Sequence, residues 1–166
     1  MEAVPHYQCV STDAPVQIDG CLNEKVWQEA APLHLVFFDG KGEPSRPTEA
    51  RMACDESYLY VAFEVTDPDI WCTFTERDAP LFKEENVEIF VRPEQDVYYE
   101  YEFNARGAIF DARFPLGEER TRQHWNWNAE DLHVAVSVQG DIGTEPGNST
   151  ADLGWTAEVA LPFSAM

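Results

Sequence analysis

Aromatic and acidic side chains alternate along residues 98–103, where Tyr, Glu and Phe follow one another with a period of two. That period belongs to a β-strand, in which successive side chains point to opposite faces of a sheet. We expect one face of this strand to be buried and the other to be wet. Further strands are predicted at 87–91 and 108–112, and the turn at 104–107 predicts a hairpin between 98–103 and 108–112.

Short runs of β-branched and aromatic residues, each ended by turn residues, recur along the rest of the chain. They predict strands at 7–10, 34–38, 48–54, 58–66, 132–138 and 155–161. The only convincing helix is a short turn within 23–31, with Asn23 as its cap and Pro32 as its end. Strands without a βαβ rhythm predict an all-β fold, a two-sheet antiparallel β-sandwich (jelly-roll-like) with one short N-terminal helical turn.

Length and charge narrow the classes of function. The 166 residues fit a single domain spanning 1–166. The chain has 31 acidic and 11 basic residues, for a formal net charge of −20. The electric field of so negative a protein repels phosphate backbones and anionic lipids, which argues against nucleic-acid and membrane partners. It suits a neutral or cationic ligand or bound divalent cations, and an acidic surface also serves solubility alone.

Four cysteines lie at positions 9, 21, 54 and 72, with long gaps and no C-x-x-C spacing. This spacing argues against a zinc knuckle or a thioredoxin-type site. One or two disulfides in an exported protein and four buried free thiols both remain open. Residues 1–5 show neither the basic nor the apolar region of a signal peptide, so the chain is either intracellular or has lost its signal.

Five phrases, in this order, resemble the family 9 carbohydrate-binding modules. They are IDGCLNEKVWQEA at 18–30, ESYLYVAFEVTDPDI at 56–70, LFKEENVEIFVRP at 81–93, YYEYEFNARGAIFDARF at 98–114 and GWTAEVALPF at 154–163. The resemblance implies an antiparallel β-sandwich that is extracellular or periplasmic. It also implies a module attached to a xylanase or another glycoside hydrolase, binding xylan- or cellulose-type chains or their reducing ends. Some members hold structural calcium.

The resemblance assigns residues as well. The family's aromatic platform lies six residues before the Glu of the VEIF strand, which corresponds to Phe82 and Glu88. A family Arg, two residues before the Asn of the next strand, is replaced here by Glu102, and that Asn is Asn104. The family's second platform follows the Pro-Phe motif. Because this chain ends at Met166, one interpretation is that the domain is truncated at its C-terminus.

Sugar recognition requires an aromatic face against the C–H groups of the ring and planar polar groups that bind neighbouring hydroxyls. The aromatic candidates outside apolar runs are Trp71, Phe82, Trp125 and Trp127, and the polar candidates are Arg77, Glu88, Glu102 and Asn104. Trp27 and Trp155 lie beside apolar runs, so we expect them in the core.

Acidic residues also cluster between the strands predicted at 58–66 and 87–91. They are Asp67, Asp69, Asp78, Glu84 and Glu85. Calcium takes about six to eight oxygen ligands, mostly carboxylates and carbonyls from loops. These five residues are therefore candidate ligands of a structural calcium ion, although their spacing does not match an EF-hand loop. Solvated acidic loops are the alternative.

These observations predict a non-catalytic carbohydrate-binding module whose partners are a poly- or oligosaccharide and a glycoside hydrolase domain. The first alternative is a structural or interaction β-sandwich without a sugar site. The second is a haem-binding β-sandwich in which Met52 and His133 ligate the iron. The third is catalysis by an acid–base pair of Glu88 and Glu102, which we disfavour for so small a domain.

Overall fold

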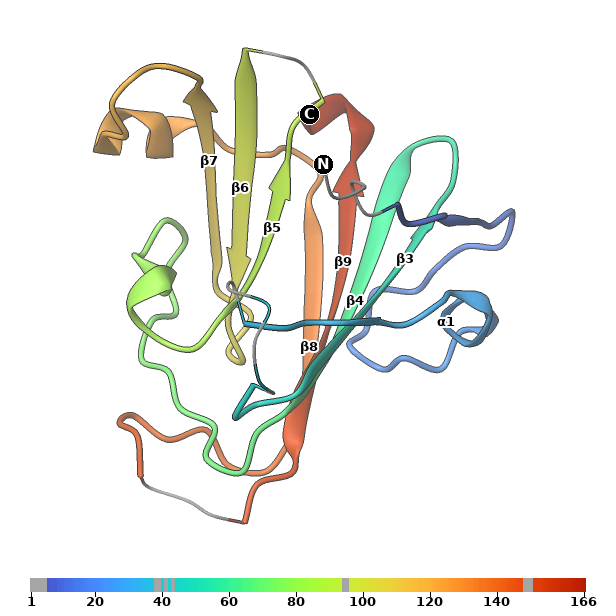
Figure 1. Ribbon diagram of the computed structural model, residues 1–166, viewed down its shortest axis with the longest axis vertical. Coiled ribbons are helices and arrows are strands. Elements are labelled where there is room, and N and C mark those ends of the chain that lie inside the picture. Colours follow the sequence, from blue (N-terminus) through green and yellow to red (C-terminus); the bar gives the residue numbers. More distant parts are fainter. Residues whose placement is uncertain (1–5, 38–39, 41, 43, 94–95, 148–150) are drawn as a thin grey trace.

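The computed structural model describes residues 6–37, 40, 42, 44–93, 96–147 and 151–166. Within these residues the chain forms a six-stranded and a three-stranded sheet, which share one core in a two-sheet sandwich (Figure 1). The predicted fold class is confirmed. No helix in this described part is long and apolar enough to cross a membrane.

The larger sheet contains the first and the last of the described strands. Its strands, in spatial order, are β1 (Val10–Ser11), β3 (Thr48–Cys54), β4 (Tyr58–Thr66), β9 (Gly154–Pro162) and β8 (His133–Gln139), with β2 (Leu33–His34) also paired to β3. Its described pairings are antiparallel except that of β1 with β3, which is parallel. The wholly antiparallel sheet that we expected is therefore corrected at this one edge.

The smaller sheet is a meander with antiparallel pairings. It consists of β5 (Val87–Val91), β6 (Val97–Phe103) and β7 (Ile109–Pro115). The hairpin predicted between β6 and β7 is present, and the Asn104 side-chain oxygen accepts the backbone N–H groups of Arg106 and Ala108 in its turn. The short helices are α1 (Lys25–Glu29), η1 (Leu81–Lys83), η2 (Arg122–Asn126) and η3 (Phe163–Ala165).

Some predicted boundaries are wrong. The run at 7–10 pairs only from Val10, and the run at 34–38 leaves the sheet early, after the Leu35 N–H bonds to the Thr48 carbonyl. Residue 38 of that run lies outside the described residues. Helix α1 has Glu24 at its N-cap and no side-chain capping bond, so Asn23 is not its cap.

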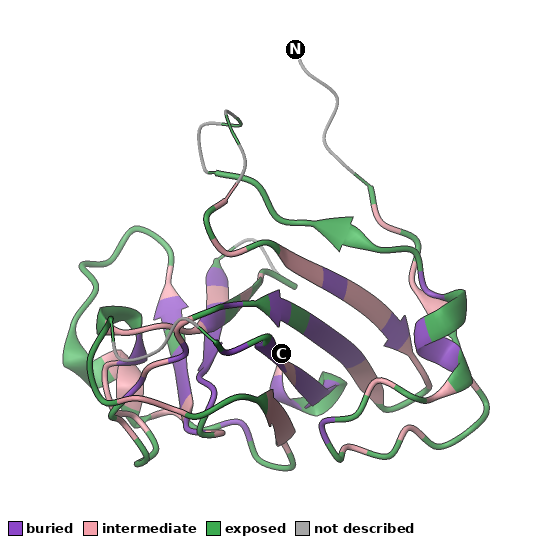
Figure 2. Ribbon diagram, turned by 90° about the horizontal axis from the view of Figure 1, so that it is seen from below, coloured by how far each residue is buried: buried purple, intermediate pink, exposed green. Residues whose placement is uncertain are grey.

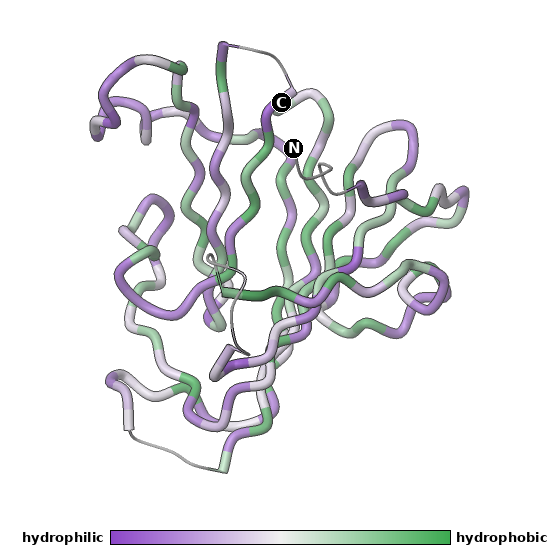
Figure 3. Tube along the Cα trace, in the orientation of Figure 1, coloured by the Kyte–Doolittle hydropathy of each residue, from purple (hydrophilic) through white to green (hydrophobic). Residues whose placement is uncertain are grey.

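The main core lies between the two sheets. Figure 2 shows buried residues concentrated on the strands, and Figure 3 shows apolar residues following the same strands. Tyr101 and Phe103 of the smaller sheet pack in one cluster with Phe63 and Trp155 of the larger one. The expected burial of Trp155 and Trp27 is confirmed, each with 3% of its surface exposed.

One buried carboxylate joins the N-terminal segment to the larger sheet. Glu158 on β9 accepts the backbone N–H groups of Asp19, at 3.0 Å, and Gly20, at 2.8 Å. Its other oxygen accepts the indole N–H of Trp27 at 2.7 Å. Hydrogen bonds to Glu158 therefore join the Ile-Asp-Gly segment near the N-terminus to β9, the last strand.

Strand β6 departs from its predicted pattern, because both of its faces are buried. Glu100 and Glu102, which we expected on a wet face, expose 3% and 0% of their surface. A separate apolar cluster, including Leu81 and Phe110, covers that outer face. The segments that carry η1 and η2 lie beside β7 in Figure 1, light green and gold respectively.

Candidate functional site

The outer face of the smaller sheet carries a row of acidic and aromatic side chains. Glu88 on β5 lies directly opposite Glu102 on β6, and Glu102 lies opposite Phe110 on β7. The next row pairs Phe90 with Glu100. Strand alternation directs all of these side chains away from the main core.

A groove with a volume of about 380 Å³ lies over this face. Phe82 and Trp125, on η1 and η2, form aromatic walls, and Arg120 and Arg122 add positive charge to the lining. Glu88 on β5 and Glu100 on β6 add carboxyl groups to the lining. The groove therefore combines rings, carboxylates and guanidinium groups from five segments, which are η1, β5, β6, β7 and the segment that carries η2.

The aromatic walls hold one another in place. Trp125 makes edge-to-face contacts with Phe82 at 6.0 Å and with Phe110 at 5.2 Å between ring centroids. Phe110 is almost fully buried, whereas Phe82 exposes 47% of its surface. Phe82 is thus an accessible ring on a rigid aromatic base, which is what a stacking platform requires.

The carboxyl groups below the rings form a hydrogen-bonded cluster. The Asn86 amide donates to Glu88 at 3.3 Å and to Glu102 at 3.1 Å. Glu102 also accepts the backbone N–H of Phe82 and shares a hydrogen bond with Glu100. Burial, followed by the bond to Glu100 and the charge of Glu88, raises the pKa of Glu102 to about 8. Glu102 is therefore protonated at neutral pH and donates to Glu100.

Arg120 brings a guanidinium group to the same cluster. It forms an ion pair with Glu100, and its side chain is 58% exposed. The group lies 4.5 Å from the centroid of the Phe114 ring, and Arg122 lies 5.4 Å from that of Trp125. These cation–π contacts hold both arginines over the groove. Burial raises the pKa of Glu100, and the Arg120 charge opposes that shift.

Three of the predicted site residues line this groove: Phe82, Glu88 and Trp125. Glu102 lies beneath it, in contact with Phe82 and Glu100. Sequence reasoning missed the other lining residues, which are Phe90, Glu100, Phe110, Arg120, Thr121 and Arg122. The alternation of β5 and β6 could have indicated Phe90 and Glu100, because each lies two residues from a predicted member.

Arg77 and Asn104 do not reach the groove and instead hold the structure together. Arg77 donates to the buried Asp111 at 2.6 Å and to Asn128 at 3.2 Å. Asn104 is fully buried, and its amide donates to the Phe74 carbonyl at 2.9 Å. The prediction that these two residues contact a ligand here is corrected.

Two of the predicted tryptophans also lie elsewhere. Trp127 packs against Tyr99 and Tyr101 at 4.9 and 6.1 Å, on the core side of β6. Trp71 forms an isolated parallel bridge with Gly143, and its backbone N–H donates to Glu85. Trp125 and Trp127 thus serve opposite faces of the smaller sheet, because the chain passes around the sheet edge between them.

The candidate calcium ligands are divided among separate networks. Asp67 and Glu85 are bridged by Arg46, at 2.9 and 2.6 Å. The remaining three have other partners: Asp69 accepts the Gly147 N–H, Glu84 accepts the Thr73 and Phe74 N–H groups, and Asp78 lies near Asp111.

Within the described ranges, no three acidic, His or Cys side chains are placed to share a metal ion. The five residues therefore do not fit one calcium site, since calcium requires several oxygens around a single point. Calcium binding by other groups stays a prediction.

The proposed haem ligands lie on opposite faces of the larger sheet. Met52 pairs with Val61, which pairs with Val159, whereas His133 pairs with Ala160. Val159 and Ala160 are consecutive, so their two rows face opposite sides of the sheet. Met52 and His133 cannot ligate one iron atom, and this alternative is wrong.

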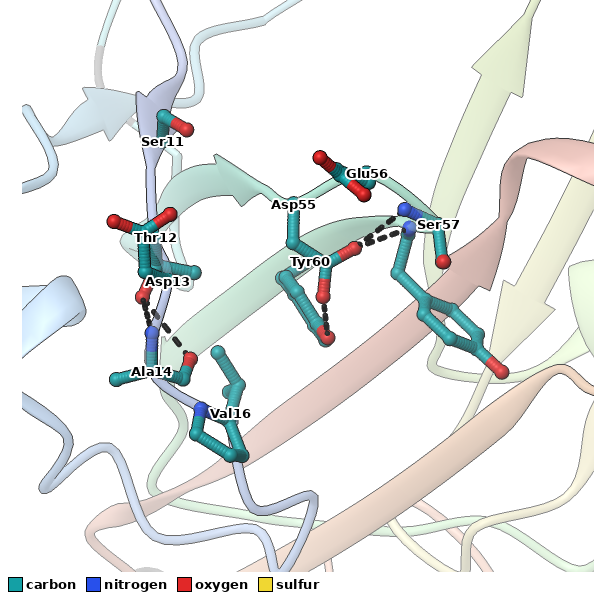
Figure 4. A pocket seen from close by; sticks show the side chains of 11 residues that line it. Ser11, Thr12, Asp13, Ala14, Val16, Asp55, Glu56, Ser57 and Tyr60 are labelled. Carbon is teal, nitrogen blue, oxygen red and sulfur yellow. Dashed lines mark hydrogen bonds between the residues drawn. The ribbon is translucent and has the colours of Figure 1, made fainter.

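A larger cavity, of about 600 Å³, lies between the segment at 11–16 and the β3–β4 turn (Figure 4). Its central carboxylate, Asp55, already accepts the N–H groups of Ser57 and Tyr58 and the hydroxyl of Tyr60, each at 2.7 Å. The Tyr60 bond is the main factor that lowers the pKa of Asp55. These groups complete a turn, so the groove on the smaller sheet is the better candidate for a functional site.

The comparisons with known proteins agree with the sandwich fold. The family model "Carbohydrate family 9 binding domain-like" matches residues 18–166. The chain belongs to this family. No curated protein sequence matches this family 9 domain well enough to count as a relative.

Solved structures show the same fold. A family 9 carbohydrate-binding module from Caldicellulosiruptor kristjanssonii in complex with cellotriose superposes with a TM-score of 0.61 and 16% identity, over 96% of this chain and 68% of that one. The complex of that module with glucose superposes with a TM-score of 0.63 and 16% identity, over 96% of this chain and 70% of that one. A Bacteroides uniformis protein, provisionally described as carbohydrate-binding, superposes with a TM-score of 0.65 and 16% identity. The match covers 95% of this chain and 72% of that one.

Proposed function

We propose that this family 9 domain is a non-catalytic carbohydrate-binding module that holds a neutral oligosaccharide in the groove on the smaller sheet. The observation that carries the proposal is the exposed Phe82 ring, supported by Trp125 and placed beside Glu88 and Arg120. A sugar ring stacks on Phe82, and its hydroxyls donate to Glu88 and accept from Arg120.

The charges of the groove match a neutral ligand. Glu88 and Glu100 line the groove together with Arg120 and Arg122, so its acidic and basic side chains are equal in number. Glu102, which lies beneath it, keeps its proton at neutral pH because its pKa is raised to about 8. A sugar without charge then exchanges hydroxyl–water hydrogen bonds for charge-assisted bonds without bringing an unpaired charge into the site.

The finer parts of the proposal concern the ligand and the setting. The related modules in complex with cellotriose and glucose support a β-linked glucan or its end, and the family resemblance supports xylan and reducing ends as well. We extend the proposal to a module that acts outside the cytoplasm and directs an attached glycoside hydrolase to its polysaccharide. Catalysis by Glu88 and Glu102 does not fit, because Glu102 is fully buried and engaged with Glu100.

The first test is a titration of the protein with cellobiose, cellotriose and xylobiose, and with their reduced alditols, by calorimetry and tryptophan fluorescence. Phe82→Ala should weaken binding at least about tenfold, or about 1.4 kcal/mol. The matched control is Phe163→Ala, because Phe163 is also an exposed phenylalanine, at 44%, and lies on η3 outside the groove. Arg120→Gln should weaken binding as well.

The outcomes separate the parts of the proposal. Binding of the sugars but not of the alditols supports recognition of reducing ends. Equal binding of both would contradict recognition of reducing ends and leave sugar binding itself in place. Equal losses in Phe82→Ala and Phe163→Ala would show that the groove is not the site. No response to any sugar would overturn the function.

The second candidate is an interaction domain. Four apolar residues in β2 and directly after it are exposed: Leu33 at 41%, Leu35 at 39%, Val36 at 65% and Phe37 at 46%. A run of exposed apolar residues is typical of a protein contact surface. A flat sugar titration would favour this reading.

A further inference from the structure

Two cysteines distant in sequence lie side by side at the edge of the larger sheet. Strand β1 runs parallel to β3 with Val10 opposite Ala53 and Ser11 opposite Cys54. The Thr12 N–H donates to the Cys54 carbonyl at 2.9 Å, which extends the pairing by one residue. Cys9 immediately precedes this strand, so the same register continued by one residue places it opposite Met52, two positions from Cys54 along β3.

The side chains of the two cysteines also share a face of the sheet. Side chains alternate along a strand, so Cys9 lies on the same side as Ser11, and Ser11 is opposite Cys54. The two thiols hydrogen-bond to each other. Both residues are partly exposed, so a soluble oxidant can reach them.

The other two cysteines occupy different environments. Cys21 is exposed and lies in the segment that leads into α1, beside Asp19. Cys72 is fully buried in the main core. In the part of the chain that the structure describes, all four thiols are free, and Cys9 with Cys54 is the pair whose thiols are in contact.

We propose that Cys9 and Cys54 are a disulfide-forming pair that closes when the protein meets a disulfide oxidant. The thiolate of one cysteine attacks a sulfur of the oxidant, such as glutathione disulfide, and releases one glutathione thiolate. The second cysteine then loses its proton, attacks the mixed disulfide and releases the second glutathione. Two protein thiols are oxidised to one disulfide, and one glutathione disulfide is reduced to two thiols.

The bond would fasten the N-terminal arm to the sheet. Strand β1 is only two residues long. Just before it, the Tyr7 hydroxyl accepts the Met52 N–H at 3.1 Å and donates to the Ala31 carbonyl at 2.6 Å. A Cys9–Cys54 disulfide would add a covalent link to these weak contacts and restrict the unfolded chain by closing a long loop.

The test is oxidation of the full chain with glutathione disulfide at mildly alkaline pH, because burial raises the pKa of Cys9 and slows the reaction near neutrality. Free thiols are then alkylated, and peptides are mapped by mass without reduction. We expect a cross-linked peptide that joins Cys9 to Cys54, with two thiols left for alkylation. The thermal midpoint should rise by several degrees on oxidation and return when dithiothreitol is added.

The variants make the test specific. Cys9→Ser and Cys54→Ser should each abolish the cross-link and the shift in midpoint, whereas Cys21→Ser, the matched control, should keep both. A cross-link to Cys21 or Cys72 would overturn the proposal. So would four alkylated thiols, or glutathione adducts on Cys9 and Cys54 without a cross-link.

Discussion

At the scale of single residues, Glu102 has the most unusual environment in the groove. It is fully buried, and its pKa is raised from 4.5 to about 8. The folded protein therefore keeps a proton on Glu102 at pH values where the unfolded chain has lost it. Folding then takes up a proton between these pKa values, so the stability from this group is complete below about pH 4.5 and falls as the pH rises to about 8.

Glu102→Gln tests this linkage, because glutamine keeps a donor toward Glu100 and cannot ionise. We expect the wild-type free energy of unfolding to fall more steeply than that of the variant between pH 5 and pH 8, measured by urea denaturation. Glu85→Gln is the control, because burial raises the pKa of Glu85 to about 7 at a site away from the groove. This variant should reduce the fall in the free energy of unfolding up to about pH 7 and leave the contribution of Glu102 in place. Equal slopes in wild type and Glu102→Gln would contradict the prediction.

At the scale of the elements, the turn before α1 depends on close packing against β8. Gly20 has a φ of +85°, and a Cβ there would lie 2.6 Å from the backbone carbonyl carbon of Val136. Gly107, in the β6–β7 turn, has a similar φ of +74°, but nothing lies within 4 Å of the position of its Cβ. The two glycines therefore separate the effect of backbone strain from that of a steric clash.

Gly107→Ala should lower the free energy of unfolding by about 1–2 kcal/mol, the usual cost of a left-handed conformation for an L-residue. Gly20→Ala should lower it by clearly more, because the strand must also move away and the bonds to Glu158 are disturbed. Urea denaturation of both variants measures the difference. Equal losses would mean that β8 can shift to accommodate the methyl group at no cost.

The strands could be predicted because their signal is local. Alternating side chains in β6 and the dense apolar run of β4 specify extended chain whatever their surroundings. The cover over the outer face could not be predicted in this way. Whether Glu100 is wet or buried depends on η1 and η2 folding across β6, and the partner of Arg77 is Asp111, which is 34 residues away.

The candidate site could be predicted only in part. The family resemblance indicated Phe82 and Glu88, and the structure brings both to one groove. Arg120 was missed because no local pattern indicates that an irregular segment returns to the sheet and pairs with Glu100. Asn104 was assigned to the ligand because an exposed and a buried asparagine look the same in sequence.

At the scale of the whole molecule, the net charge of −20 opposes the compact state. Ion pairs such as Lys25 with Glu29 are exposed and contribute little against it. Salt screens this repulsion, since the Debye length falls from about 30 Å at 0.01 M to about 8 Å at 0.15 M ionic strength.

Raising the ionic strength over that range should therefore raise the thermal midpoint. The affinity for a neutral sugar should change less than about twofold, because no net charge is transferred on binding. Scanning calorimetry and titration at matched salt concentrations provide both measurements, with sucrose at equal osmolality as the control. A midpoint that falls with added salt would show that attractive surface pairs outweigh the repulsion.

The groove lies on the far side of a sheet whose other face forms the main core. The residues that line it, including Phe82, Glu88, Arg120 and Trp125, are therefore separated by a layer of backbone from the packing between the two sheets. Evolution or a laboratory selection can diversify these positions as a library while the sandwich stays the same. Domains with this one fold can then differ in the ligand that they bind, and some of them can bind no ligand at all.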